Sequence, residues 1–284
     1  MADDGTAMTA PGIAPRGGAR PTIAVDAMGG DHAPAAIVAG ALAAAATLDV
    51  DILLAGRPEV LAAHLPGGSA PPGVTILPAS EVVAMDDEPA NAVRTKKDSS
   101  LVQCAVAVKD GRADAMVGAG NTGATMAAAL LRMGRIRGVQ RPAIAAPIPV
   151  PGTTRLSLLL DVGATVDPEA AWLVQWALLG REYAKVRLGI EEPTIALLSN
   201  GEEAGKGDEL RKQSFALLAD VKGFIGNVEG RDLLSAGADV IVTDGFTGNV
   251  ALKTLEGAML GLAGLVFAVV DEPPYAAVAD ALKF

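Results

Sequence analysis

The sequence predicts an α/β protein centred on a parallel β-sheet. Short apolar runs alternate with longer segments of helical composition, which is the pattern of strand–helix–strand units. Several of the apolar runs end in polar turns rich in glycine, and a helical segment follows each turn. Because the carboxyl ends of parallel strands meet at one edge of a sheet, we expect these turns to form one site.

The composition narrows the class of protein. The chain has 284 residues, of which 50% are hydrophobic, enough for one large α/β domain or two modest ones. Its formal net charge of −10 argues against general nucleic-acid binding. The only cysteine, Cys104, lies in an apolar run, so we expect a small core residue in a reducing compartment, with a nucleophile as the alternative. Since His32 and His64 are the only histidines, we expect no metal site.

The ends of the chain differ from its middle. We expect residues 1–20, which are rich in Ala, Gly and Pro, to be a disordered tail and residues 21–284 to form a single α/β domain. The first residues are acidic and lack the apolar segment of a signal peptide. The longest apolar run, 258–270, has 13 residues, whereas a membrane-spanning helix needs roughly 20.

The first strand, expected at 22–25, leads into a turn that contains two glycines. Pro34 suits the first turn of a helix, which we expect over 35–46. Asp26 and Asp31 therefore lie at the carboxyl end of a strand, where open α/β sheets place their sites. The alternative for Asp31 is that it caps the helix. Further strands are expected at 50–54 and 74–77, with a helix at 58–64 between them.

Three cations precede the next helix, which begins at Ser99 or Ser100 and continues to about Lys109. They are Arg94, Lys96 and Lys97. A helix start beside this group predicts an oxyanion or phosphate site, with Asp98 orienting the lysines. The alternative is a solvated loop with a capping serine.

A strand, a glycine turn and a helix follow. We expect a buried central strand at 115–117 and a helix over 124–131. The turn between them contains Gly118, Gly120, Asn121, Thr122 and Gly123. Its spacing matches the dinucleotide fingerprint, but no Asp or Glu follows before Leu160 to hold a ribose. We therefore expect backbone amides that bind phosphate, and the alternative is a tight turn that binds nothing.

The second half of the chain repeats the alternation. Strands are expected at 156–160, 194–198 and 240–242, with a long helix at 168–185 whose Trp172 and Trp176 are core or interface residues. Four arginines lie within ten residues after the central turn, and they predict a docking face for an acidic partner or are scattered surface charges. These are Arg132, Arg135, Arg137 and Arg141.

The stretch 252–270 carries no charge beyond Glu256. Because it lacks a polar stripe, we expect it to be covered by the core, by a partner subunit or by a membrane surface.

Six blocks of sequence occur in order between residues 22 and about 257. They are Asp26–Pro34, Arg94–Leu101, Gly118–Gly123, Asn200–Leu210, Phe224–Arg231 and Thr243–Lys253. At these blocks the chain resembles the acyl-ACP:phosphate acyltransferases of bacterial phospholipid synthesis. The family usually continues through a Gly-Gly-Ala-Pro-Leu-Leu-Gly segment to a late His-Gly-Ser, and this sequence contains neither.

The resemblance implies a fold, a reaction and partners. The implied fold is a Rossmann-like α/β/α sandwich similar to phosphotransacetylase and to the isocitrate and isopropylmalate dehydrogenases. The implied reaction converts acyl-ACP and phosphate to acyl phosphate and ACP, without a cofactor. The implied protein is a cytoplasmic homodimer that touches the membrane peripherally, where acyl phosphate passes to a membrane-bound glycerol-phosphate acyltransferase. The arginines at 132–141 would then dock the acyl carrier protein.

The reaction needs groups that position phosphate and donors for an oxyanion. The candidates for catalysis are Lys96, Lys97, Lys206, Asn121, Asn227 and Asn249. The candidates for substrate binding are Gly29, Gly30, Asp31, Arg94, Ser99, Ser100, Gly120, Thr122, Gly123, Asn200, Glu202, Glu203, Glu229, Asp244, Gly248 and Lys253.

Three other functions stay open at this point. A phosphotransacetylase that uses acyl-CoA shares the same chemistry. A nicotinamide-dependent dehydrogenase of the same fold is disfavoured by the missing acidic residue after the glycine turn. A binding module for phosphorylated ligands would bind phosphate without turnover.

Overall fold

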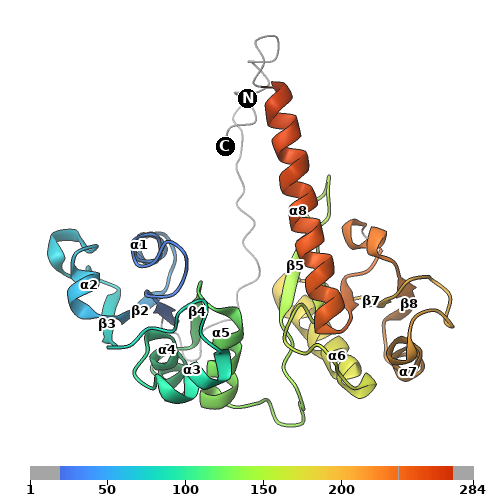
Figure 1. Ribbon diagram of the computed structural model, residues 1–284, viewed down its shortest axis with the longest axis horizontal. Helices are drawn as coiled ribbons and strands as arrows, with labels where there is room; N and C mark the ends of the chain where they lie inside the picture. The colour runs from blue at the N-terminus through green and yellow to red at the C-terminus, as the bar shows by residue number, and fades with distance from the viewer. Residues whose placement is uncertain (1–19, 236, 271–284) are drawn as a thin grey trace. The chain divides into compact units, whose positions relative to one another are not determined.

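The computed structural model describes residues 20–235 and 237–270. They form two compact units, one ending at Pro142 and one beginning at Ala143 (Figure 1). Each unit has its own sheet and its own core. The single domain expected over 21–284 is thus divided in two, and the expected tail at 1–20 lies outside the described residues except for Arg20.

The N-terminal unit contains a parallel sheet of four strands in the order β3-β2-β1-β4. Its strands are β1 (Thr22–Asp26), β2 (Asp51–Gly56), β3 (Val74–Pro78) and β4 (Ala115–Gly118). Its helices are α1 (Ala35–Thr47), α2 (Pro58–Ala62), α3 (Pro89–Thr95), α4 (Ser100–Lys109) and α5 (Thr122–Ala128), with the short segments η2 (Pro66–Gly68) and η3 (Ala129–Met133). The alternation of apolar strands and helices thus produces the parallel sheet that the sequence predicts.

The C-terminal unit contains a sheet of five strands in the order β5-β6-β9-β7-β8. Among the described strands of this sheet only β5 runs antiparallel to its neighbour, and this strand was not predicted from the sequence. The strands are β5 (Ala145–Pro149), β6 (Leu156–Leu160), β7 (Ile195–Leu198), β8 (Phe224–Val228) and β9 (Val240–Val242). The helices are α6 (Ala170–Leu188), α7 (Glu209–Leu218) and α8 (Gly245–Val270), with the short segment η4 (Gly230–Leu234).

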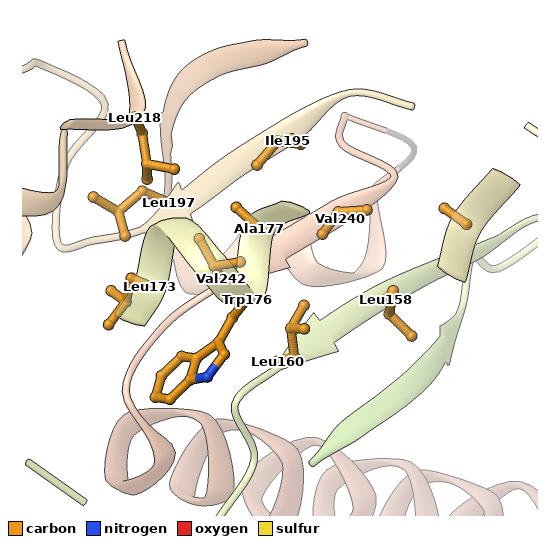
Figure 2. Packing of buried hydrophobic residues seen from close by; sticks show 11 residues of the cluster. Leu158, Leu160, Leu173, Trp176, Ala177, Ile195, Leu197, Leu218, Val240 and Val242 are labelled. Atoms are coloured by element: carbon orange, nitrogen blue, oxygen red, sulfur yellow. The ribbon is translucent and has the colours of Figure 1, made fainter. Parts of the chain in front are cut away.

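The core of the C-terminal unit forms where α6 packs on the sheet (Figure 2). Trp176 is fully buried among side chains of β6, β7 and β9, and Trp172 packs at the margin of this cluster. Gly180 lets α6 approach closely, since a β-carbon there would lie 2.6 Å from Cγ1 of Val240. The two tryptophans are therefore core residues, as their spacing indicates.

Two expectations about the strands are wrong. Among the described strands only β1 pairs with β4, which therefore lies at the edge of its sheet, and Val117 is 52% exposed. It is therefore not the buried central strand that its apolar sequence suggests. The polar turns also follow strands of two separate sheets, so one sheet edge does not collect them all.

Candidate functional site

The turns that follow β1 and β4 meet at the carboxyl edge of the N-terminal sheet. Parallel pairing places Asp26 opposite Gly118, and the backbone then brings Gly29 against Gly120. A β-carbon on Gly120 would lie 3.0 Å from Cα of Gly29, and one on Gly30 would lie 3.0 Å from the oxygen of Ala119. Glycines from two distant sequence blocks are thus required by one main-chain contact.

A buried carboxylate lies beneath this contact. Asp26 is 3% exposed, and its Oδ1 accepts a hydrogen bond from the Met28 N–H at 3.1 Å. Burial raises the pKa of Asp26, although the Ser100 hydroxyl and the N–H groups of Met28 and Gly29 oppose that shift. Asp26 therefore belongs to the same sheet edge as Gly29 and Ser100.

Asp31 lies on the surface of the turn after β1. The residue before α1 is Pro34, and no side chain among the described residues caps this helix. The alternative that Asp31 caps the helix is therefore wrong, and its carboxylate faces solvent.

Asn121 holds the glycine turn after β4 to a neighbouring loop. Its Oδ1 accepts from the Ala124 N–H at 2.9 Å and so caps α5. Its Nδ2 donates to the carbonyls of Asp87 at 3.1 Å and Met85 at 3.2 Å. Both hydrogens of the side-chain amide are thus engaged by the main chain in this structure.

The remaining residues of this turn differ in their surroundings. Thr122 is exposed at the start of α5. Gly123 lies against Pro89, because a β-carbon there would be 2.8 Å from the Cγ of that proline. The turn is therefore packed on one side and open at Thr122.

The cationic group before α4 divides into paired and exposed side chains. Lys96 forms an ion pair with Asp87 and donates to the carbonyl of Val82 at 3.0 Å. Lys97 and Arg94 are exposed. Asp98 accepts from the Ser80 hydroxyl at 2.6 Å, so the expectation that it orients the lysines is wrong.

The two serines at the start of α4 are buried. The Ser99 hydroxyl accepts from the Val102 N–H at 3.4 Å and donates to the carbonyl of Lys96 at 2.8 Å. Ser99 is thus the capping serine that the sequence allows, and Ser100 faces Asp26.

Cys104 lies on the buried face of α4. Burial raises the pKa of its thiol, and the nearby charge of Asp26 raises it further. A buried thiol that stays protonated is a poor nucleophile, so the interpretation as a core residue is confirmed.

The four arginines expected at a docking face do not share one environment. Arg132 is half-buried and donates to the carbonyl of Val93 at 2.8 Å, so it holds η3 to α3. Arg135 donates to the carbonyl of Gln140 at 2.7 Å and is exposed. Arg137 and Arg141 are also exposed.

The loop after β7 carries a group of exposed polar side chains in the C-terminal unit. They are Asn200, Glu202, Glu203 and Lys206. Asn227, on β8, is buried and donates from Nδ2 to the carbonyl of Glu203 at 2.9 Å. Arg231 pairs with Glu202 and with Glu229, each at 3.0 Å. The loop is thus tied to β8 and to the segment that follows it.

The junction of β9 and α8 forms the other side of this region. Asp244 is 4% exposed, forms an ion pair with Arg211 and accepts from the Thr247 N–H at 2.8 Å. A cavity of about 350 Å³ lies beside this pair. It is lined by Leu198, Ser199, Asn200, Gly207, Asp208, Arg211 and Thr247.

Three further candidates lie on α8. Gly248 is buried, and a β-carbon there would lie 1.9 Å from the oxygen of Asp161. Asn249 is exposed one residue further along. Lys253 is exposed and pairs with Glu256 at 2.8 Å.

From Glu256 to Val269, every residue of α8 is exposed. Leu252 and Leu255 pack on the core, whereas Leu260 is 75% exposed and Leu265 is 70% exposed. The core therefore does not cover this stretch. By length and composition α8 could cross a membrane, which the 13-residue apolar run had not indicated, because the helix extends upstream through the paired Lys253 and Glu256.

No group of three or more His, Cys, Asp or Glu side chains within residues 20–235 and 237–270 is arranged to hold a metal ion.

Comparisons with known proteins identify the family. A family model described as "Fatty acid synthesis protein" matches residues 21–276. The chain belongs to this family. It is 51% identical over 252 residues to the phosphate acyltransferase of Desulfitobacterium hafniense (strain Y51), a match that covers 88% of this chain and 73% of the relative. It is 51% identical over 242 residues to the phosphate acyltransferase of Bacillus licheniformis, covering 84% of this chain and 72% of the relative. This member of the fatty acid synthesis protein family is therefore an acyltransferase.

Solved structures support the fold. The phosphotransacetylase from Streptococcus pyogenes is similar with a TM-score of 0.63 and 18% sequence identity, over 85% of this chain and 82% of that chain. A branched-chain phosphotransacylase from Enterococcus faecalis V583 is similar with a TM-score of 0.55 and 18% identity, over 83% of this chain and 84% of that chain. The parallel α/β fold predicted for this acyltransferase is confirmed.

Sequence reasoning did not single out two charged residues of this acyltransferase. Asp161 directly follows the apolar strand β6, much as Asp26 ends the apolar strand β1, and this similar position was the available signal. Arg211 lies in the first turn of α7 and carried no signal, because its partners Thr243, Asp244 and Thr247 are more than 30 residues away in the sequence.

Proposed function

We propose that this acyltransferase moves a long-chain acyl group from the thioester of acyl carrier protein to inorganic phosphate. The observation that carries the proposal is the 51% identity, over 88% of the chain, to a protein named phosphate acyltransferase. The description of the matching family, fatty acid synthesis, supports an acyl donor from that chemistry.

The proposed reaction transfers an acyl group from the sulfur of the carrier thioester to an oxygen of phosphate. A phosphate oxygen attacks the thioester carbonyl and forms a tetrahedral oxyanion. The carbon–sulfur bond then breaks, acyl phosphate is released, and the carrier thiolate takes up a proton. Phosphate is already anionic at neutral pH, so the protein must chiefly position it and supply donors to the oxyanion.

The described contacts rank the candidate groups. Lys97 and Lys206 have exposed ammonium groups, and Asn249 has an exposed amide, so a substrate can reach them. Lys96 is already paired with Asp87, and the amides of Asn121 and Asn227 already donate to carbonyls. We propose that Lys97 and the amides of the turn after β4 hold phosphate, and that Lys96 and Asn121 shape that turn.

The partners follow from the substrates. We propose that the exposed arginines after α5 dock the acyl carrier protein, because an acidic carrier is attracted by a basic patch on a chain of net charge −10. The product leads to a membrane, where a membrane-bound glycerol-phosphate acyltransferase would consume it, so the protein works in the cytoplasm with a peripheral membrane contact.

The exposed apolar part of α8 supports a homodimer. We propose that α8 packs against a second copy and that its tip, 265–270, touches lipid weakly. Val266→Asp/Phe267→Asp should then lower co-sedimentation with anionic vesicles and leave the dimer intact in analytical ultracentrifugation. A monomeric variant would instead show that the tip belongs to the subunit interface.

The reaction itself is tested by release of the carrier thiol. The full chain is mixed with long-chain acyl-ACP, and free thiol is followed with and without phosphate. Phosphate-dependent release is expected, and it should exceed the release from acyl-CoA of the same chain length. Preference for acyl-CoA would favour a phosphotransacetylase, and phosphate binding without any thiol release would contradict an acyltransfer role.

A further inference from the structure

One buried guanidinium connects α7 to the junction of β9 and α8. Arg211 is 8% exposed, although arginine is seldom buried. Its Nη1 donates to Oδ2 of Asp208 at 3.0 Å. Its Nη2 donates to the hydroxyls of Thr243 at 3.0 Å and Thr247 at 2.9 Å, and it pairs with Asp244. A single side chain thus fixes three positions of that junction.

The packing around Arg211 depends on a glycine. Gly207 has a positive φ of +92°, and a β-carbon there would lie 2.4 Å from Cβ of Arg211 and 3.0 Å from the hydroxyl of Ser199. The absence of a side chain at Gly207 leaves the space that the base of Arg211 occupies. Gly207, Arg211 and Thr247 also line the 350 Å³ cavity, so the network forms part of the cavity wall.

Stability alone is a weak reason for this arrangement. Taking two charges out of water costs several kcal/mol, and a buried ion pair is often no more stabilising than apolar side chains of the same volume. A charged network that borders a cavity at the carboxyl ends of strands is instead typical of functional sites.

We propose that Arg211 is a positioning residue for acyl transfer: it holds Thr243, Asp244 and Thr247 in the arrangement that the cavity needs to receive substrate. This role deepens the proposed function and rests on it. Thr243, Asp244 and Thr247 belong to the sequence block that resembles the phosphate acyltransferases, whereas Arg211 lies one residue beyond the nearest block.

The ionisation of Asp244 gives the role a measurable signature. Burial would raise the pKa of Asp244, but the N–H and hydroxyl of Thr247 and the Arg211 guanidinium outweigh it and hold that pKa below its usual value. Asp208, at the start of α7, is the other carboxylate on the guanidinium. Without Arg211, burial persists while the cation is gone, so the pKa of Asp244 should rise.

A second arginine–aspartate pair in the same unit, whose arginine is half exposed, supplies the control. Arg155 donates from Nη2 to Oδ1 of Asp239 at 2.8 Å, and Asp239 also accepts from the Thr194 hydroxyl at 2.7 Å. This arginine is likewise paired with a buried aspartate that binds a threonine, but neither Arg155 nor Asp239 lines the cavity beside Arg211.

The experiment compares Arg211→Met and Arg211→Lys with Arg155→Met, all in the full chain with acyl-ACP and phosphate. Arg211→Met should lower kcat by about tenfold or more, since small displacements of positioned groups are costly. Its activity should also fall as the pH is lowered from about 7 to about 5, because Asp244 then takes up a proton. Added guanidinium ion should restore part of the loss. Arg155→Met should keep the kcat and the pH profile of the unsubstituted enzyme.

Arg211→Lys keeps the positive charge but loses the planar guanidinium that donates to several acceptors at once. It should therefore lower kcat without causing the fall in activity between about pH 7 and about pH 5. It carries the test if Arg211→Met does not fold. The proposal is overturned if an active enzyme tolerates both Arg211 variants as well as it tolerates Arg155→Met. A full chain that releases no thiol at all, with or without phosphate, would overturn the proposed function and this role together.

Discussion

Asp26 and Asp161 occupy the same place in two different sheets, yet their surroundings differ. Each is a buried carboxylate at the carboxyl end of an internal strand: Asp26 is the last residue of β1, and Asp161 directly follows β6. Asp161 is wholly buried and accepts from the N–H groups of Ile144 at 2.9 Å, Ala164 at 3.0 Å and Thr165 at 2.7 Å. Asp26 accepts fewer main-chain donors and faces the Ser100 hydroxyl at the start of α4.

The closure around the two carboxylates differs as well. A β-carbon on Gly245 would lie 2.7 Å from Oδ2 of Asp161, and a β-carbon on Gly248 would lie 1.9 Å from the main-chain oxygen of the same residue. Asp161 is thus enclosed by main-chain groups of the neighbouring loop and of the start of α8. Asp26 lies under a turn whose neighbours, Asp31 and Thr122, are exposed. An aspartate at the end of a strand therefore has two different roles here. Asp161 stabilises the loop around it, whereas Asp26 lies beside a surface that solvent reaches.

The largest expected effect comes from Asp161→Asn. The amide would place donor hydrogens against main-chain N–H groups that now bind a carboxylate, which should cost about 3 kcal/mol of unfolding free energy. Fewer main-chain N–H groups bind the carboxylate of Asp26, so Asp26→Asn should cost about 1 kcal/mol of unfolding free energy. At equal folded fraction it should lower acyl transfer more than Asp161→Asn does. Urea unfolding and thiol-release kinetics measure both. Equal losses of stability would remove the distinction between the two sites.

Gly120→Ala tests the main-chain contact beside Asp26. The added carbon meets Cα of Gly29, so we expect a loss of about 1–3 kcal/mol together with weaker use of phosphate. The matched control is Gly40→Ala in α1, where nothing lies within 4 Å of the new carbon and helix propensity improves. A Gly120→Ala protein that is as stable as the Gly40→Ala protein would show that the two turns separate easily.

Lys97→Met tests whether phosphate binds at the exposed carboxyl edge of the N-terminal sheet. The side chain is exposed, so stability should change by less than about 1 kcal/mol, whereas kcat/KM for phosphate should fall about tenfold or more. Lys109→Met, an exposed lysine at the other end of α4, should leave both unchanged. Full activity of Lys97→Met would exclude this lysine from the phosphate site.

The smallest expected effect is the pH dependence of the stability that is lost in Asp26→Asn. In the folded protein the pKa of Asp26 is raised above its ordinary value of 3.8, so the folded state holds the proton more tightly than the unfolded state. Stability from this group is therefore present at low pH and declines as the pH rises through the raised pKa. Asparagine does not titrate, so the stability lost in Asp26→Asn should be greater at about pH 4 than at about pH 7. Calorimetric unfolding at the two pH values measures it, and the opposite trend would mean that Asp26 is stabilised as a carboxylate.

The sequence predicts the elements of this fold well and their grouping poorly. Apolar runs and helix starts identify β1, α1, α4, β6 and α6 to within a few residues, because burial and capping are local properties of the chain. The edge position of β4 depends on which strand lies beside it, and its apolar residues resemble those of a central strand. The antiparallel β5 was missed because Pro147 and Pro149 interrupt the usual strand pattern.

Features of the candidate site that depend on one sequence block were predictable, and features that join distant blocks were not. The glycine turn after β4 and the serine cap of α4 follow from their own sequence. The pairing of Lys96 with Asp87 and the contact of Gly29 with Gly120 depend on tertiary structure. Arg211 is the clearest case, since its acceptors Thr243, Asp244 and Thr247 lie beyond β8 and β9 in the sequence.

The contact between Gly29 and Gly120 contains no side chains, and this has a consequence for entropy. Main-chain atoms at such a contact are ordered once, when the protein folds, and they have no rotamers left to lose. An anion held by the amides of this turn would therefore meet donors whose ordering cost was met before it arrived. Lysine side chains, by contrast, must give up rotamer freedom each time they close on a ligand.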